Sequence, residues 1–152
     1  MARFAGRAAL VSGAVGGFGR AIATVLAAEG ARLVLTDRDE GSLEALAAEL
    51  TGTEIATLAG DVSRETTASA LVDLATERFG GLDIAINNAG IAHDYKRLQE
   101  ISAEEAERVI AVDLMGVFFA MKHQIAAMNA RFASDGTKAA IVNVASVAGL
   151  GG

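Results

Sequence analysis

Short apolar runs alternate with longer amphipathic stretches along the chain. Five short runs are apolar at most positions, as expected for strands that are covered on both faces; they are residues 8–11, 32–36, 55–58, 83–86 and 139–144. Between them, helical patterns occupy residues 17–29, 42–50, 64–79 and 103–131. This alternation predicts right-handed crossovers and one Rossmann-like, doubly wound parallel sheet of five strands, an α/β fold.

The ends of the helical patterns carry residues that favour such ends. Gly30, Gly52 and Gly80 come just after the first three patterns, where glycine suits a left-handed cap. Ser102 and Glu105 have the spacing of a capping box for the fourth pattern. Because no repeat, linker or low-complexity segment interrupts the order, we expect residues 1–152 to belong to a single domain.

The fourth helical pattern carries two apolar stripes. The larger stripe advances by three or four residues through Ala106, Ile110, Leu114, Val117, Met121, Ile125 and Met128. The smaller stripe holds Val109, Gly116 and Ala120. Two interpretations stay open: both stripes belong to the core, or one packs on the sheet while the other faces a partner helix.

Composition narrows the class of protein. The 152 residues are 52% hydrophobic and 21% charged, contain no cysteine and carry a formal net charge of −6. This excludes a disordered chain, disulfides and thiolate-ligated metals, and it disfavours nucleic acid and anionic membranes as partners. No targeting segment and no unbroken apolar stretch of about 18 residues is visible, so we expect a cytoplasmic protein. His93 and His123 lack a second ligand at metal-binding spacing, so no metal site is predicted.

A glycine-rich turn joins the first predicted strand to the first predicted helix. It reads Ser12-Gly13-Ala14-Val15-Gly16-Gly17-Phe18-Gly19. Glycine permits a tight turn and brings backbone N–H groups close to a phosphate, and the following helix N-terminus adds free donors. The alternative is an ordinary loop in a glycine-rich chain. The position of the turn between strand and helix favours a dinucleotide phosphate as its ligand.

An acidic residue ends the second predicted strand. Asp37 stands eighteen positions beyond Gly19, where a carboxylate can accept hydrogen bonds from the adenosine ribose and would repel a 2′-phosphate. Arg38 complicates this interpretation, because arginine is the usual partner of that phosphate. A solvated turn over residues 37–40, with Asp39 starting the next helix, is the alternative. The position of Asp37 favours NAD over NADP.

Three further motifs follow in order along the chain. Asp61-Val62 follows the third predicted strand, Asn87-Asn88-Ala89-Gly90 ends the fourth, and Ile141-Val142-Asn143-Val144-Ala145-Ser146 contains the fifth. Together with the spacing of Gly13, Gly17 and Gly19, this order resembles the short-chain dehydrogenase/reductase family over the whole chain. Methyltransferases that use S-adenosylmethionine share the sheet and the acidic residue, but they lack the Asn-Asn-Ala-Gly element and are a much weaker match.

The resemblance implies an NAD-dependent oxidoreductase that transfers hydride between a nicotinamide and a small alcohol or carbonyl substrate. It implies a pyrophosphate site at Ser12, Gly13, Val15, Gly16, Gly17, Phe18 and Gly19, a ribose site at Asp37 and Arg38, an adenine site at Asp61 and Val62, and a nicotinamide site at Asn88, Ala89 and Gly90. Ser146 matches the catalytic serine, which would polarise the substrate carbonyl. For the full-length enzyme, we expect a homo-oligomer formed through the helix over residues 103–131.

Two departures from the family pattern concern catalysis. Asp113 stands where the family has an asparagine that supports a water in its proton relay. An aspartate there could hold the water or pair with a lysine, but its negative charge could also interrupt the relay. A third alternative is a tolerated but costly carboxylate in a partly buried seam.

The second departure concerns the acid/base pair of the family, a tyrosine followed four residues later by a lysine. The one tyrosine is Tyr95, and Gln99 stands four positions after it. We therefore expect this chain to be the N-terminal portion of a longer enzyme, incomplete at its C-terminus, without the later strands and helices, and inactive by itself. The alternative is a truncated dinucleotide-binding module with no turnover.

Overall fold

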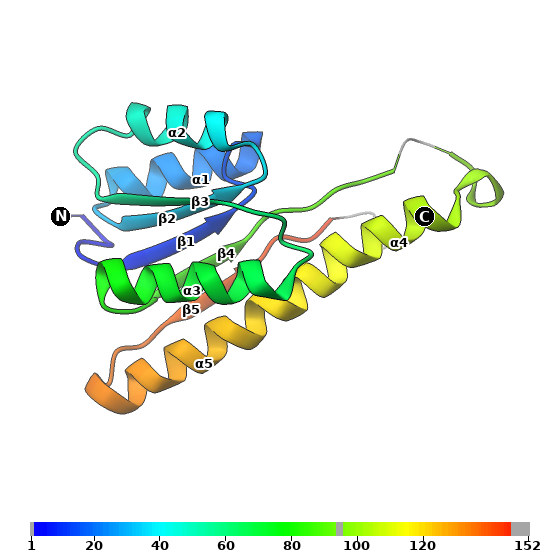
Figure 1. Ribbon diagram of the computed structural model, residues 1–152. Helices are drawn as coiled ribbons and strands as arrows, with labels where there is room; N and C mark the ends of the chain where they lie inside the picture. Colours follow the sequence, from blue (N-terminus) through cyan, green and yellow to red (C-terminus); the bar gives the residue numbers. More distant parts are fainter. Residues whose placement is uncertain (1, 94–95, 147–152) are drawn as a thin grey trace.

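Parallel strands form one sheet in the order β3-β2-β1-β4-β5 (Figure 1). In the computed structural model, which describes residues 2–93 and 96–146, the strands are β1 (Ala8–Ser12), β2 (Arg32–Asp37), β3 (Ile55–Ala59), β4 (Ile84–Asn87) and β5 (Ala140–Asn143). Every pairing between neighbouring strands is parallel. The strand order reverses beside β1, which confirms the predicted doubly wound sheet and places its switch point between β1 and β4.

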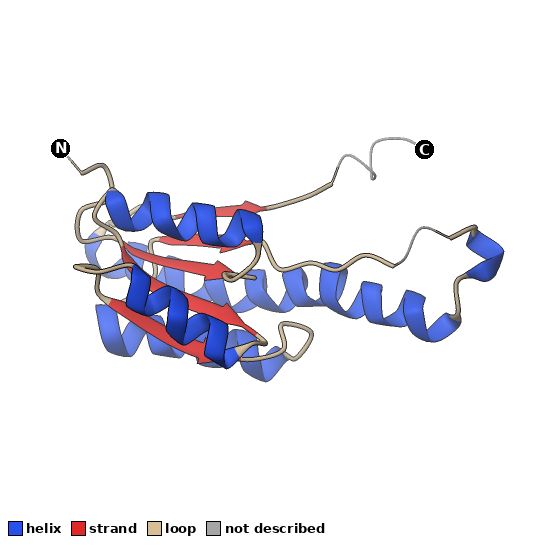
Figure 2. Cartoon of the chain, turned by 90° about the horizontal axis from the view of Figure 1, so that it is seen from above, coloured by secondary structure: helices blue, strands red, loops and turns tan. Residues whose placement is uncertain are grey.

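Helices cover both faces of the sheet (Figures 1 and 2). Helices α1 (Gly17–Ala28) and α2 (Glu40–Glu49) lie on one face, whereas α3 (Glu65–Phe79) and α5 (Val117–Asp135) lie on the other. Because successive strand side chains point to opposite faces, Leu10 packs in the core under α3 and α5 while Val11 packs in the core under α1 and α2. Both cores therefore share β1 as their central strand.

The helix ends agree with the predicted caps. Gly30, Gly52 and Gly80 all have positive φ. The Ser102 side chain accepts from the backbone N–H of Glu105, and the Glu105 side chain accepts from the backbone N–H of Ser102. These contacts confirm that local sequence sets the boundaries of these elements.

The predicted long helix has a break in its regularity. It runs as α4 (Ala103–Val109), a π-helical segment η2 (Ile110–Gly116) and α5, and it continues to Asp135 rather than ending at residue 131. A π-helical turn holds more residues than an α-helical turn, so it shifts the phase of the residues that follow. The predicted boundary is therefore too short, and one uniform period does not describe the helix.

The phase shift decides which side of the helix meets the sheet. Gly116, Gln124 and Met128 are buried, whereas Ile110, Leu114 and Ile125 are 52%, 62% and 42% exposed. The larger apolar stripe is thus divided, because Met128 joins the core whereas Ile110, Leu114 and Ile125 face outward. The interpretation that both stripes lie entirely in the core is wrong for these residues.

The helix over Ala103–Asp135 is long and apolar enough to cross a membrane, judged by length and composition only. One such helix is weak evidence for a membrane, and 11% of its apolar window is buried in the structure. Here Met128 contributes to the core formed with α3, and Gln124 bonds to β4. The cytoplasmic location stays a prediction.

Candidate cofactor site

The glycine-rich turn lies at the carboxyl end of β1 and leads directly into α1. The turn folds back on itself so closely that a Cβ on Gly19 would lie 2.0 Å from the carbonyl oxygen of Gly13. Gly13 itself has a φ of 63°, and a Cβ there would lie 2.9 Å from the Cα of Ala89. Glycine at both positions is therefore a steric requirement of the turn.

The N-terminus of α1 is open to a ligand. Within the described residues, no side chain caps α1 at Gly16, and a Cβ on Gly17 would meet no atom within 4 Å. Phe18, in the same turn, is 79% exposed. First-turn N–H groups without helical partners, together with the helix dipole, favour an anion at this position. The turn thus has both the space and the donors that a pyrophosphate requires.

Asp37 lies beside this turn, at the end of β2. Its Oδ2 accepts a hydrogen bond from the backbone N–H of Val15 at 3.3 Å, and its Oδ1 accepts one from the backbone N–H of Arg38 at 2.8 Å. Each carboxylate oxygen can accept a second hydrogen bond. The two backbone bonds fix the carboxylate and leave acceptor positions for a pair of hydroxyl groups.

A cleft runs along the carboxyl ends of the strands. Its lining comes from separate segments of the chain: Gly13, Asp37, Arg38, Gly60, Asp61, Val62, Ala89, Gly90, Ile91 and Val112. The fold therefore brings together residues from all the predicted cofactor motifs at the strand ends, where open α/β sheets bind their ligands.

Asp61 lines the end of this cleft near Arg38 and stays ionised at neutral pH. The backbone N–H of Ser63 donates to its Oδ1 at 2.9 Å and is the main reason that the pKa of Asp61 lies below the ordinary value. The Ser63 side chain lowers it further, and so do the positive charges of Arg38 and Arg64. This end of the cleft holds both signs of charge.

Asn88 and Ala89 are attached to the end of β1 by Ser12. The Ser12 hydroxyl oxygen accepts from the backbone N–H groups of Asn88 and Ala89, both at 3.1 Å. In return, the Asn88 side-chain amide donates to the carbonyl oxygens of Ser12 at 3.0 Å and Gly13 at 3.1 Å. Ser12 is buried, and its two hydrogen bonds fix the backbone at the start of the segment Asn88–Gly90.

Asp113 lies in the π-helical segment, next to this loop. Its Oδ1 accepts a hydrogen bond from the backbone N–H of Ile91 at 2.9 Å, and a Cβ on Gly90 would lie 3.5 Å from the same oxygen. The carboxylate is exposed. The carboxylate therefore lies at the edge of the cleft beside Gly90.

Ser146 lies apart from the lining of the cleft. It is exposed and lies three residues after the end of β5. Between β5 and Ser146, the backbone N–H of Val144 donates to the carbonyl oxygen of Asn87 at 2.9 Å. This bond continues the β4–β5 ladder toward the strand ends that carry the cleft. Tyr95, the one tyrosine of the chain, lies outside the described residues.

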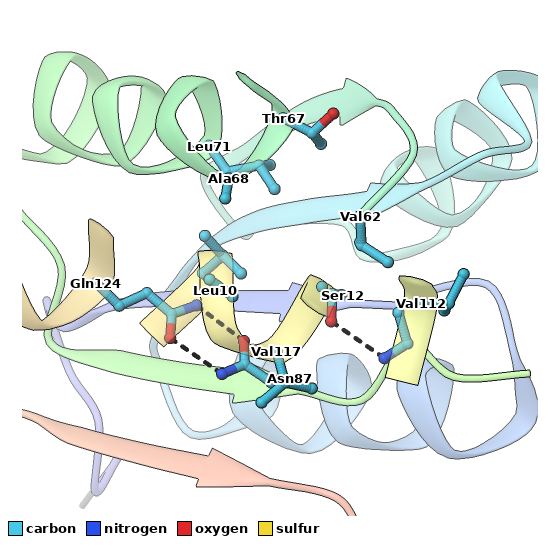
Figure 3. A pocket seen from close by; sticks show the side chains of 13 residues that line it. Leu10, Ser12, Val62, Thr67, Ala68, Leu71, Asn87, Val112, Val117 and Gln124 are labelled. Carbon is cyan, nitrogen blue, oxygen red and sulfur yellow. Dashed lines mark hydrogen bonds between the residues drawn. The ribbon is translucent and has the colours of Figure 1, made fainter. Parts of the chain in front are cut away.

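Motif reasoning missed a buried amide network under the site. Gln124 and Asn87 are 1% and 4% exposed and bond to each other (Figure 3). Asn87 also bonds to Asn143. A signal exists in the sequence, because Gly116, Ala120, Gln124 and Met128 are spaced by four residues. A polar residue on such a face indicates a buried hydrogen-bonding role.

Comparison with known proteins gives a family match. The family model described as short chain dehydrogenase matches residues 7–152. The chain belongs to the short-chain dehydrogenase family. It is 38% identical to levodione reductase of Leifsonia aquatica over 99% of this chain and 56% of the relative, and 41% identical to cis-4-hydroxycyclohexanecarboxylate dehydrogenase of Sinomonas cyclohexanicum over 98% of this chain and 58% of the relative.

Solved short-chain dehydrogenases have the same fold. The crystal structure of levodione reductase matches with a TM-score of 0.91 at 38% identity, over 99% of this chain and 58% of that one. A short-chain dehydrogenase/reductase from Burkholderia phymatum in complex with NAD also gives a TM-score of 0.91, at 39% identity, over 99% of this chain and 52% of that one. This chain thus spans little more than half the length of these relatives.

Proposed function

We propose that residues 1–152 are the NAD-binding portion of an oxidoreductase that interconverts an alcohol and a carbonyl compound. The observation that carries the proposal is the cleft in which the glycine-rich turn, Asp37 and the segment Asn88–Gly90 meet. When bound there, a nicotinamide cofactor supplies the hydride acceptor or donor. The protein supplies binding, orientation and electrostatics.

Each part of the cleft has a distinct role in this proposal. The pyrophosphate lies against the turn, where the first-turn N–H groups of α1 at Gly17, Phe18 and Gly19 bind it. Gly13, Val15 and Gly16 shape the turn around it, because the N–H groups of Val15 and Gly16 already bond to Asp37 and Gly13. Asp37 and Arg38 flank the adenosine ribose, and Asp61 and Val62 flank the adenine. Asn88, Ala89 and Gly90 face the nicotinamide, and Ser12 holds their backbone in place.

The catalytic assignments rest on the family resemblance. The hydroxyl of Ser146 donates a hydrogen bond to the substrate oxygen and stabilises the charge that develops there. Asp113 holds the backbone of Ile91 at the nicotinamide end and adds a negative charge near it. The cis-4-hydroxycyclohexanecarboxylate and 2,5-dichloro-2,5-cyclohexadiene-1,4-diol dehydrogenases among the relatives suggest a ring alcohol or ketone as the substrate class.

NAD is the preferred cofactor in this proposal because the Asp37 carboxylate repels a 2′-phosphate. Titration with NADH, followed by nicotinamide fluorescence, tests it. We expect wild type to bind NADH more tightly than NADPH. Asp37→Ala should weaken NADH binding about tenfold and reduce the difference in affinity between NADH and NADPH. Asp39→Ala is the matched control, because it removes the same charge from the cap of α2, outside the cleft.

The outcomes of this titration separate the parts of the proposal. A wild-type chain that binds neither dinucleotide overturns the cofactor assignment. A wild-type chain that prefers NADPH, or an Asp37→Ala chain that behaves like Asp39→Ala, contradicts the ribose role of Asp37 and leaves the phosphate site in place.

The alternative function is cofactor binding without turnover. Within the 152 residues, Tyr95 is not followed by a lysine four positions later, so we expect this chain to lack the acid/base pair and to be inactive by itself. NAD and a panel of ring and chain alcohols test this through the absorbance of NADH. Sustained NADH formation would contradict the expectation and make the chain an enzyme in its own right.

A further inference from the structure

A reciprocal pair of hydrogen bonds joins α5 to the end of β4. The side-chain nitrogen of Gln124 donates to Oδ1 of Asn87 at 2.8 Å, and Nδ2 of Asn87 donates to Oε1 of Gln124 at 3.0 Å. Figure 3 shows the two amides pointing toward one another. Each amide uses one donor and one acceptor in this pair, so their relative orientation is defined.

The surroundings of the pair are apolar. Gln124 and Asn87 line a small cavity whose other walls include Leu10, Leu71 and Val117. Both side chains are almost completely buried. A buried amide that loses its partner in such surroundings carries the full desolvation cost, so the pair resists any displacement of Asn87.

Asn87 extends the network to the neighbouring strand. Its Nδ2 also donates to Oδ1 of Asn143 at 2.8 Å. Asn87 and Asn143 are register partners in the β4–β5 ladder. A single helix residue, Gln124, thereby fixes the side chain that joins the last positions of both strands.

Both strand ends lead directly into the proposed catalytic segments. Asn87 immediately precedes Asn88, whose backbone N–H bonds to Ser12, and Asn143 stands three residues before Ser146. A shift of Asn87 therefore moves the nicotinamide segment relative to the glycine-rich turn. It also alters the hydrogen bond from Asn87 to Asn143, three residues before Ser146.

We propose that Gln124 is a positioning residue for the nicotinamide segment Asn88–Gly90. It acts through Asn87 and does not itself contact the cofactor. This inference rests on the proposed cofactor site, because its readout includes NADH binding. Its structural part, the immobilisation of Asn88 and Ala89, is measurable without a cofactor.

The glutamate variant provides a pH-dependent test. In Gln124→Glu, a protonated carboxyl group can still donate to Oδ1 of Asn87 and accept from its Nδ2, whereas a carboxylate can only accept. We expect NADH to bind this variant within about twofold of wild type at pH 5, and about tenfold more weakly than wild type at pH 8. Gln124→Met cannot make either bond, so we expect a loss of about tenfold at both pH values.

A variant near the opposite end of β4 separates positioning from global stability. Arg131 pairs with the buried Asp83, which precedes β4, with Nε 3.6 Å from Oδ1. Arg131→Met should lower the Tm and leave NADH affinity unchanged. Amide hydrogen exchange of Asn88 and Ala89 adds the readout without cofactor: we expect faster exchange in Gln124→Met than in Arg131→Met at the same distance below each Tm.

The possible results lead to different conclusions about Gln124. Wild-type NADH affinity and unchanged exchange at Asn88 and Ala89 in both Gln124 variants would overturn the inference. An equal loss of affinity in Arg131→Met at matched stability would also overturn it, because the effect would then be global. A wild-type chain that does not bind NADH overturns the proposed function, and the exchange data alone then decide whether Gln124 positions the loop.

Discussion

At the scale of single residues, two glycines of the glycine-rich turn, Gly17 and Gly19, have different steric surroundings. Gly19 has no room for a side chain, since its Cβ would lie 2.0 Å from the carbonyl oxygen of Gly13. Gly17 has open space, with no atom within 4 Å of such a Cβ. Gly19 is therefore required by the fold of the turn, whereas Gly17 leaves room for a ligand.

The two glycines therefore predict different results for the same substitution. Gly19→Ala should lower the free energy of unfolding by about 2 kcal/mol or more, because the turn must open. Gly17→Ala should leave the Tm nearly unchanged and weaken NADH binding at least tenfold, because the new methyl group occupies the pyrophosphate position. Thermal unfolding and NADH titration check both. Normal NADH binding by Gly17→Ala would contradict the proposed phosphate position.

At the scale of elements, an ion pair ties the β4–α4 connection to the long helix. Glu105 at the start of α4 accepts from Lys96 and completes the capping box with Ser102. These contacts lower the pKa of Glu105 from 4.5 to about 2, and the hydrogen bond from the Lys96 side chain is the largest cause. The start of the helix is therefore held by the ionised form of one carboxylate.

The lowered pKa gives the stabilising contribution of Glu105 a defined pH window. Because the folded-state pKa lies below the unfolded value, the contribution is present above about pH 4.5 and is lost as the pH falls toward 2. Lys96→Met should return the pKa of Glu105 toward 4.5, although the backbone N–H of Ser102 keeps it somewhat lower. A carboxyl NMR titration measures this change. The same pKa in wild type and variant would show that Lys96 is not its cause.

At the scale of the whole molecule, one face of the long helix remains open to a partner. Ile110, Leu114, Phe118, Ile125 and Phe132 are all between 42% and 62% exposed. In Figure 1 the N-terminal part of this helix extends beyond the sheet. An exposed apolar surface of this kind is a candidate interface for the homo-oligomer that we expect of the full-length enzyme.

Assembly through this helix predicts a change of mass in solution. We expect the wild-type chain to elute as a dimer or larger species in size-exclusion chromatography with light scattering. Leu114→Glu, on the exposed face, should shift it to a monomer, because a charge cannot be buried there unpaired. Glu107→Gln, a charge change on the same helix at an exposed polar position, is the control. A wild-type monomer would show that this chain does not assemble through the helix by itself.

How much of this protein follows from its sequence depends on the range of the interactions involved. The alternation of strands and helices, the caps at Gly30 and Ser102, and the place of the glycine-rich turn before α1 were all predictable. Their causes act within a few residues: backbone sterics, capping bonds and the period of apolar positions. The predicted position of Asp37 at the end of β2 agrees with the structure for the same reason.

Only the tertiary structure decided which side of the long helix is buried and what Gln124 bonds to. A π-helical segment changes the phase of the residues that follow it, and the apolar period of the sequence does not show it. Gln124 and Asn87 are 37 positions apart, so only folding makes them partners. The sequence by itself therefore determined the cofactor motifs, because each is local, and the tertiary structure determined the buried network under them, because burial and pairing are properties of the packed chain.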